Sequence, residues 1–106
     1  MNGTLLATIV MAVRERRYEV SLHIWTNYLN EPDRPLPSAI IYSIAEDAPK
    51  IVVDDPADSR GARAEIIGLS ENGRSVYSHI GYGRNPMKLI TAWHTTKATY
   101  DNAQSV

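Results

Sequence analysis

Several features that would place a small protein in a known class are missing from this sequence. It contains no cysteine, which excludes a disulfide framework or a thiolate metal site and is typical of a reducing cytosol. No apolar run is long enough to span a bilayer, and the longest near the N-terminus, Leu5 to Val13, is interrupted by Thr8. Three arginines follow this run and no basic residue precedes it, the wrong polarity for a secretory signal. We therefore expect a cytoplasmic protein without a membrane partner.

An excess of positive charge is also missing. The 11 Lys and Arg residues are balanced by 12 Asp and Glu residues, so the formal net charge is −1. This balance argues against a protein that coats DNA or another polyanion, which would normally be basic. It leaves room for local basic patches, and 8 of the 11 cations are Arg, which can bind phosphate through two hydrogen bonds at once.

The common catalytic motifs do not occur. There is no phosphate-binding glycine-rich loop with a lysine, no His-Glu-x-x-His and no nucleophile elbow. His23, His79 and His94 lack the spacing of metal ligands. We therefore expect neither a metal nor a cofactor.

The apolar pattern of the first half predicts helices. With 106 residues and a hydrophobic fraction of 43%, the chain suits a single domain over residues 1–106. A spacing of three and four residues between apolar positions predicts helices over Thr4 to Arg17, Ser21 to Asn30 and Ser38 to Ala45. Ser21 is the expected N-cap of the second helix, on which Leu22, Trp25 and Leu29 share a face. Between the first two helices, Tyr18 to Val20 is a linker or a minor strand.

The second half changes to the alternation typical of strands. We predict four strands, with hairpin turns at Ser70 to Gly73 and Gly83 to Pro86 and a polar tail over residues 95–106 that forms a helical turn near 96–102. The fold class is α+β, with N-terminal helices packed on a four-stranded antiparallel β-meander. The expected strands are Lys50 to Asp54, Arg63 to Leu69, Arg74 to Tyr82 and Met87 to His94.

Strand alternation then separates two faces of the sheet. If the last hairpin closes tightly with Gly81 opposite Lys88, Val76 comes near Trp93 and Ser78 near Thr91, on a mostly apolar face that meets the helices. The other face then carries Tyr77, His79 and His94. A slip of one residue would turn His79 and His94 to the opposite face.

Tyr and His side chains are suited to RNA cleavage without a metal. One group takes the proton of the 2′-hydroxyl, another protonates the leaving oxygen, and a cation stabilises the phosphorane. Arg63, Arg74 and Arg84 are close enough in this topology to supply that cation. The alternative is that these Tyr and His residues are only the solvent-facing positions of a half-exposed sheet.

His23 and the two tryptophans each have two readings. His23 lies near the positive end of its helix, which favours the neutral, base-competent ring, but it could equally pack under the proline-rich loop that follows. Trp25 and Trp93 are expected in the core more often than at a ligand, and Trp93 is the one that could contact RNA.

The order and spacing of several short motifs resemble a family of small bacterial proteins on the RelE-like toxin fold (the BECR fold), related to BrnT-type toxins. The resemblance covers about Leu5 to His94. Its motifs are Tyr18-Glu-Val-Ser-Leu-His23, Arg34-Pro-Leu-Pro-Ser38, Asp54-Asp-Pro-Ala-Asp-Ser-Arg-Gly61, Gly68 with Gly73-Arg74, and Leu89-Ile-Thr-Ala-Trp93.

This resemblance implies the toxin of a toxin–antitoxin system, a metal-independent endoribonuclease of the mRNA-interferase kind. Its partners would be RNA and a cognate antitoxin protein, and it would form either a homodimer or a hetero-oligomer with the antitoxin. The catalytic candidates are His23, Tyr77 and His94, and the substrate-binding candidates are Arg60, Arg63, Arg74, His79 and Trp93.

The chain departs from the family pattern at three positions. Asn27 stands where the family usually has an arginine, Tyr77 replaces a common histidine, and Trp93 replaces a tyrosine. Asn27 and the near-neutral charge favour the alternative function, a non-enzymatic protein-binding module such as a degenerate toxin, an immunity protein or an antitoxin-type partner.

Overall fold

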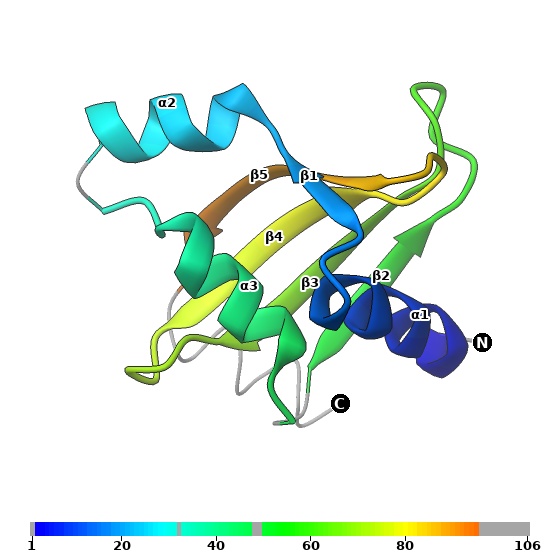
Figure 1. The fold of residues 1–106 in the computed structure, drawn as a ribbon, viewed down its shortest axis with the longest axis horizontal. Coiled ribbons are helices and arrows are strands. Elements are labelled where there is room, and N and C mark those ends of the chain that lie inside the picture. Colours follow the sequence, from blue (N-terminus) through cyan, green and yellow to red (C-terminus); the bar gives the residue numbers. More distant parts are fainter. Residues whose placement is uncertain (1, 32, 48–49, 96–106) are drawn as a thin grey trace.

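The computed structural model describes residues 2–31, 33–47 and 50–95, and it places the three helices before the meander (Figure 1). The α+β class and the N-terminal position of the helices are confirmed. The elements in chain order are α1 (Asn2–Arg14), β1 (Tyr18–Val20), α2 (Leu22–Asn30), α3 (Pro37–Ala45), β2 (Ile51–Asp55), β3 (Arg63–Leu69), β4 (Ser75–Gly81) and β5 (Met87–His94).

The sheet has five strands in the order β1-β5-β4-β3-β2, one more than predicted. Strands β2 to β5 form the expected antiparallel meander, while β1 adds to its edge in parallel with β5, with Tyr18 opposite Met87. A strand of three residues is too short to show alternation, and a parallel partner far along the chain leaves no turn signal in the sequence. These two facts explain why Tyr18–Val20 could not be distinguished from a linker.

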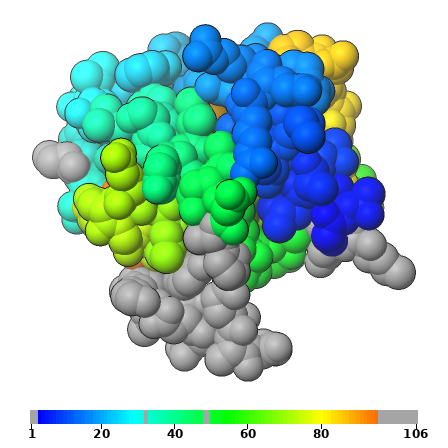
Figure 2. All heavy atoms as spheres, turned by 60° about the horizontal axis from the view of Figure 1, so that its bottom comes forward, coloured from blue at the N-terminus to red at the C-terminus, as the bar shows by residue number. Residues whose placement is uncertain are grey.

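The core lies between one face of the sheet and the helices. Isoleucines of α1 and α3 (Ile9, Ile40, Ile44) and apolar residues of the strands (Ile66, Ile80, Leu89) are all at most 1% exposed. Seen as spheres, α1, β1, α2 and α3 form a continuous layer on this side, with the β3–β4 hairpin beside α3 (Figure 2). The opposite face of the sheet is called the open face below.

Gly68 sets how closely α3 approaches the sheet. A Cβ atom at this position would lie 2.2 Å from the carbonyl oxygen of Ser43 on α3, closer than any side chain could tolerate. The absence of a side chain at Gly68 therefore lets the backbone of α3 rest directly on β3.

Helix ends differ slightly from the prediction. The N-cap at Ser21 is confirmed, since its side chain accepts a hydrogen bond from Ile24 N. By contrast, α1 ends at Arg14 rather than Arg17, because Arg16 adopts a φ of 60° and turns the chain toward β1. Gly73 also has a positive φ, 82°, at the predicted β3–β4 hairpin. The helical turn expected near 96–102 lies outside the described residues.

The predicted register of the last hairpin holds at its closed end and fails beyond it. Gly81 pairs with Lys88 and Ile80 with Leu89, as expected, but His79 pairs with Thr91. One extra residue of β5, Ile90, is therefore accommodated in a β-bulge. Beyond the bulge every side chain of β5 is on the opposite face from the one predicted.

This bulge corrects the expected open face. Trp93 pairs with Tyr77 and joins it there, whereas His94 pairs with the buried Val76 and so belongs to the helical side. His79 and Tyr77 keep their predicted face. The prediction of His94 beside Tyr77 and His79 is therefore wrong, and a bulge without a glycine or proline left no signal that could have revealed it.

Helix α2 also packs differently from a typical amphipathic helix. Leu22, Trp25 and Leu29 share a face as predicted, but that face is turned to solvent, with exposed fractions of 79%, 46% and 76%. Only Ile24 of this helix is buried. Trp93 is 38% exposed, so the expectation that the tryptophans lie in the core is wrong for both.

Candidate functional site

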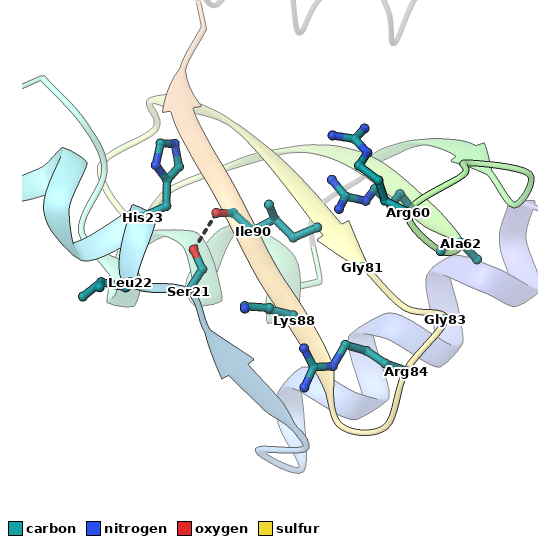
Figure 3. Close-up of a pocket in the computed structure, with 12 residues that line it drawn as sticks. Ser21, Leu22, His23, Arg60, Ala62, Gly81, Gly83, Arg84, Lys88 and Ile90 are labelled. Atoms are coloured by element: carbon teal, nitrogen blue, oxygen red, sulfur yellow. Dashed lines mark hydrogen bonds between the residues drawn. The ribbon is translucent and has the colours of Figure 1, made fainter.

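A hollow of about 490 Å³ lies at the end of the sheet where β4 turns into β5. Three segments line it: the start of α2, the end of the β2–β3 loop, and the β4–β5 hairpin. In Figure 3, β5 crosses the hollow with Ser21 and His23 on one side of the strand and Arg60 on the other. We call this hollow the basic pocket, because its lining includes Arg60, Arg63, Arg84 and Lys88 together with His23.

Ser21 fixes one wall of the basic pocket. Its hydroxyl donates a hydrogen bond to the carbonyl of Ile90 at 2.6 Å, its backbone N–H bonds to Leu89 O at 3.0 Å, and its Oγ caps α2 (Figure 3). Ile90 is the bulged residue, so the hydroxyl satisfies the carbonyl of the extra residue. The cap and the bulge together hold the first turn of α2, and with it His23, at the pocket.

The β2–β3 loop forms the facing wall and is held against the β4–β5 hairpin. The backbone N–H groups of Tyr82 and Gly83 both donate to the carbonyl of Ala62, at 3.0 and 3.1 Å. A Cβ on Gly83 would lie 2.8 Å from Ala62 N, so glycine is needed for this close approach. The loop therefore brings Arg60 and Arg63 to the same pocket as Lys88.

Two of the four cations are paired within the described chain, and two are not. Arg60 forms a two-point ion pair with Asp58 at 2.9 and 3.0 Å, and Arg84 pairs with Glu19 at 3.1 Å. Arg63 and Lys88 form neither an ion pair nor a hydrogen bond through their side chains with any described residue, although the charge of Arg63 helps to lower the pKa of Asp58 and Lys88 is opposite Glu19 in the β1–β5 register. The pocket therefore has spare positive charge, to which the N-terminal dipole of α2 adds.

Asp58, the ion-pair partner of Arg60 beside this pocket, is held in its charged form. The side-chain hydrogen bond from Arg60 lowers the pKa of Asp58 far below its ordinary value, and the same contact raises the pKa of Arg60. Arg60 is thus committed to Asp58, which leaves Arg63 and Lys88 as the cations that an anion would meet.

His23 is exposed and is oriented by Asn27. The amide nitrogen of Asn27 lies 3.0 Å from Nε2 of His23, one helical turn earlier. An amide nitrogen can only donate, so in this arrangement Nε2 accepts and the neutral ring carries its proton on Nδ1. Asn27 therefore has a local role in positioning the histidine.

His79 lies beside the basic pocket on the open face. It is directly opposite Glu65, one pleat from the Arg63–Gly81 pair. A smaller hollow that includes His79 also contains Arg60 and Arg63, so the two hollows share a wall, and four carboxylates line this second hollow as well: Asp54, Asp55, Asp58 and Glu65. His79 is the second ionisable ring that the fold brings near these arginines.

The other predicted residues gather at the far end of the sheet, which we call the aromatic end. It consists of Arg34, Arg74, Tyr77, Trp93 and His94. Tyr77 and Trp93 stack with ring centroids 4.2 Å apart, and the guanidinium of Arg34 lies 5.9 Å from the Trp93 ring. Arg74 approaches Asp33 at 3.8 Å, and Nδ1 of His94 lies 3.2 Å from the carbonyl of Ser75.

The predicted catalytic residues therefore do not meet in one place. Lys88 and His94 are six positions apart on β5, which corresponds to roughly 20 Å of strand. His23 lines the basic pocket, His94 lines hollows at the other end, and Tyr77 belongs to that same aromatic end but lies on the open face. Of the predicted RNA-binding residues, Arg60, Arg63 and His79 lie with His23, whereas Arg74 and Trp93 lie with His94.

The environments of Tyr77 and His94 both favour their neutral forms. Burial and a hydrogen bond with Glu65 raise the pKa of Tyr77, which keeps the phenol protonated and unsuited to act as a base. Burial lowers the pKa of His94, despite the opposing effect of its bond to Ser75. Tyr82 is similar to Tyr77, since its 2.6 Å bond to Asp54 raises its pKa to about 12.

Lys88 is the pocket residue that sequence reasoning missed. The tight hairpin that pairs Gly81 with Lys88 was predicted, and alternation from that pair puts the lysine on the open face beside Arg63. Lys88 could therefore have been placed at the pocket from the sequence. The hydrogen bond from the Ser21 hydroxyl to the bulged Ile90 could not have been predicted, because the sequence gives no sign of the bulge.

Comparisons of the chain with protein-family models, with curated proteins and with solved structures found no match. Within residues 2–31, 33–47 and 50–95, no group of three or more His, Cys, Asp or Glu side chains is arranged to hold a metal ion. None of the helices described here has the length and apolar character that a bilayer span requires.

Proposed function

We propose that this protein is the toxin component of a cytoplasmic toxin–antitoxin pair, and that it cleaves RNA without a metal at the basic pocket. The observation that carries the proposal is the convergence, in one hollow, of His23 with Arg63 and Lys88, two cations that form no ion pair within the part of the chain that the structure describes. Phosphate is the anionic group of RNA, and cations with no internal partner are free to bind it.

The chemistry requires two proton transfers and one stabilised charge. A base removes the proton of the 2′-hydroxyl, whose oxygen attacks the neighbouring phosphorus, and an acid protonates the 5′-oxygen as its bond to phosphorus breaks. The products are a 2′,3′-cyclic phosphate and a 5′-hydroxyl end. Arg63 and Lys88 stabilise the phosphorane, and His23 and His79, which line two hollows that share Arg63, are the candidates for the two proton transfers.

Asn27 shapes how His23 would act. The neutral ring, with Nε2 held by the Asn27 amide, can donate a hydrogen bond from Nδ1 but cannot act as an acid. In the acid role His23 is the imidazolium: Asn27 turns its amide oxygen to Nε2–H, and Nδ1 gives its proton to the leaving oxygen. His79 then takes the base role. The aromatic end contributes stability of the sheet rather than catalysis in this proposal.

A cleavage assay tests the proposal. Single-stranded RNA incubated with the protein should be cut equally well with and without EDTA, and the fragments should carry cyclic phosphate ends. His23→Ala and Arg63→Ala should each reduce the rate by about a hundredfold or more. Intact RNA after incubation with the purified protein, together with normal growth of cells that express it, would overturn the proposal.

The second candidate function is a non-enzymatic protein-binding module. The exposed apolar face of α2 favours it, because a face of this kind is typical of a protein interface. Stable capture of an antitoxin-type protein by this chain, lost in Trp25→Ala and retained in His23→Ala, would support a binding function in place of RNA cleavage.

A further inference from the structure

The outward face of α2 is apolar, uncharged and symmetric in its spacing. Four of its exposed positions, Leu22, Trp25, Thr26 and Leu29, follow the three- and four-residue steps of one helix stripe, and the exposed polar residues His23 and Asn30 flank it. Leu22 and Leu29 lie at the ends of the stripe, and Trp25 and Thr26 lie at its centre. When the direction of the helix is reversed, a leucine therefore still falls at each end. Leu22 and Leu29 are 79% and 76% exposed, more than any other large apolar residue that the structure describes.

We infer that this stripe is a two-fold interface between two copies of the chain, in which the α2 helices pack antiparallel. A two-fold axis that passes between Trp25 and Thr26 places Leu22 of each copy against Leu29 of the other. It also sets Trp25 against Thr26 of the second copy. An interface of this kind must be complementary to itself, and the symmetric spacing of the stripe meets that condition.

The charge distribution favours a second copy over a charged partner. Helix α2 has no Asp, Glu, Lys or Arg over its nine residues, although the chain as a whole is 22% charged. Two identical faces that carried charge would repel each other, whereas these faces do not. A basic or acidic partner would in turn find no charge here to recognise.

The size of the stripe predicts a weak dimer. Nine helical residues extend over about 14 Å, and a standard stable interface covers roughly 800 Å² of each partner. Four side chains on a helix of that length fall short of this area, so we expect a concentration-dependent equilibrium between monomer and dimer. Trp25 at the centre would contribute most of the affinity.

This geometry also places the dimer contact beside the basic pocket. Leu22 belongs to the stripe and to the pocket lining, and its side chain points away from β5 (Figure 3). In the antiparallel arrangement the C-terminal end of the second α2 lies at this rim. The dimer would therefore have two basic pockets, one on each side of the helix pair.

Sedimentation velocity of the full chain over a wide concentration range tests the inference. The unmodified protein should shift from monomer to dimer as concentration rises, and Leu22→Glu and Leu29→Lys should each weaken the dimer by about tenfold or more, because each buries an unpaired charge. Met11→Glu is the matched control, since Met11 is a half-exposed apolar residue of α1, and it should leave the equilibrium unchanged.

A double variant tests the antiparallel geometry itself. Leu22→Glu combined with Leu29→Lys brings opposite charges together across an antiparallel pair and like charges together across a parallel pair, so association should recover only in the antiparallel case. Urea unfolding of each variant verifies that its fold is intact. A chain that stays monomeric at every concentration, or a dimer that Leu22→Glu does not weaken, overturns the inference and leaves the stripe to a different protein.

Discussion

The two ends of the sheet contain similar residue types but differ in how far those residues are already paired. At the aromatic end, Trp93 stacks on Tyr77, and Arg34 is held by Glu31 at 2.8 Å and by the carbonyl of Ala92 at 3.0 Å. At the basic pocket Arg60 and Arg84 are ion-paired, but Arg63 and Lys88 have no such partner among the described residues. A histidine, an arginine and a hollow occur at both ends.

This difference in the pairing of the cations helps to distinguish a binding site from a cluster of residues that only stabilises the fold. A cation whose hydrogen bonds are already satisfied inside the protein must lose them before it binds an external phosphate, which reduces any gain. A cation without an internal partner loses only water. The basic pocket is therefore the better candidate for a ligand, although the aromatic end looks more like a recognition surface by composition.

The largest expected effect concerns RNA affinity. Arg63→Ala and Lys88→Ala should each weaken binding of a labelled single-stranded RNA by about tenfold or more, because each removes a charge-assisted hydrogen bond worth roughly 1.5–3 kcal/mol. The salt dependence of binding should also fall by about one unit of slope for each phosphate contact removed. Fluorescence anisotropy at several salt concentrations measures both quantities.

Arg74→Ala is the matched comparison, since it removes the same charge at the aromatic end. It lies away from the basic pocket, so its loss should change RNA affinity little. Its contact with Asp33 is long, at 3.8 Å, and both groups are well exposed, so stability should also change little. Equal losses of affinity in Arg63→Ala and Arg74→Ala would abolish the distinction between the two ends.

The next effect concerns the wall of the basic pocket. Ser21→Ala should lower the free energy of unfolding by about 2 kcal/mol, because it removes the cap of α2 and leaves the Ile90 carbonyl without its hydroxyl partner. Urea denaturation measures this loss. Ser21→Thr keeps a hydroxyl and should recover most of the stability, and an unchanged midpoint in Ser21→Ala would show that the bond does not hold this wall.

Sequence reasoning succeeded where the structure depends on local signals. Strands β3 and β5 have the predicted bounds, Ser21 caps α2, and the tight β4–β5 turn sets Gly81 opposite Lys88. Each of these follows from alternation, from a capping residue or from a turn, all of which act over a few neighbouring positions.

Sequence reasoning failed where the structure depends on contacts between residues that are far apart in the sequence. The pairing of Tyr18–Val20 with β5 and the bulge at Ile90 both arise when α2 and β1 dock on the sheet, and no nearby residue signals either. A single bulge was enough to separate His94 from Tyr77 and so to divide a predicted site of three residues between two ends. The site was harder to predict than the fold, because one change of register alters which side chains meet.

A smaller effect should come from the aromatic stack. In a double-mutant cycle with Tyr77→Leu and Trp93→Leu, we expect a coupling of about 1 kcal/mol in the free energy of unfolding, the usual size for a stacked aromatic pair. RNA affinity should change little in the same variants. A large loss of affinity with no coupling would instead make the aromatic end part of the RNA-binding surface.

The smallest effect is a pH dependence at the aromatic end. Burial lowers the pKa of His94 below its ordinary 6.5, so the folded protein favours the neutral ring while the unfolded chain takes up a proton at higher pH. The lowered pKa of His94 therefore makes the free energy of unfolding depend on pH. Above pH 6.5 both states hold the neutral ring and the protein keeps its full stability; as the pH falls below 6.5, the unfolded chain takes up a proton first and stability is lost until the folded state is protonated as well. His94→Gln should therefore flatten the decline of unfolding free energy between about pH 7.5 and about pH 5.5, as measured by urea titration. An undiminished decline in His94→Gln would show that this ring does not couple folding to protonation, and the structural role assigned to the aromatic end would lose its support.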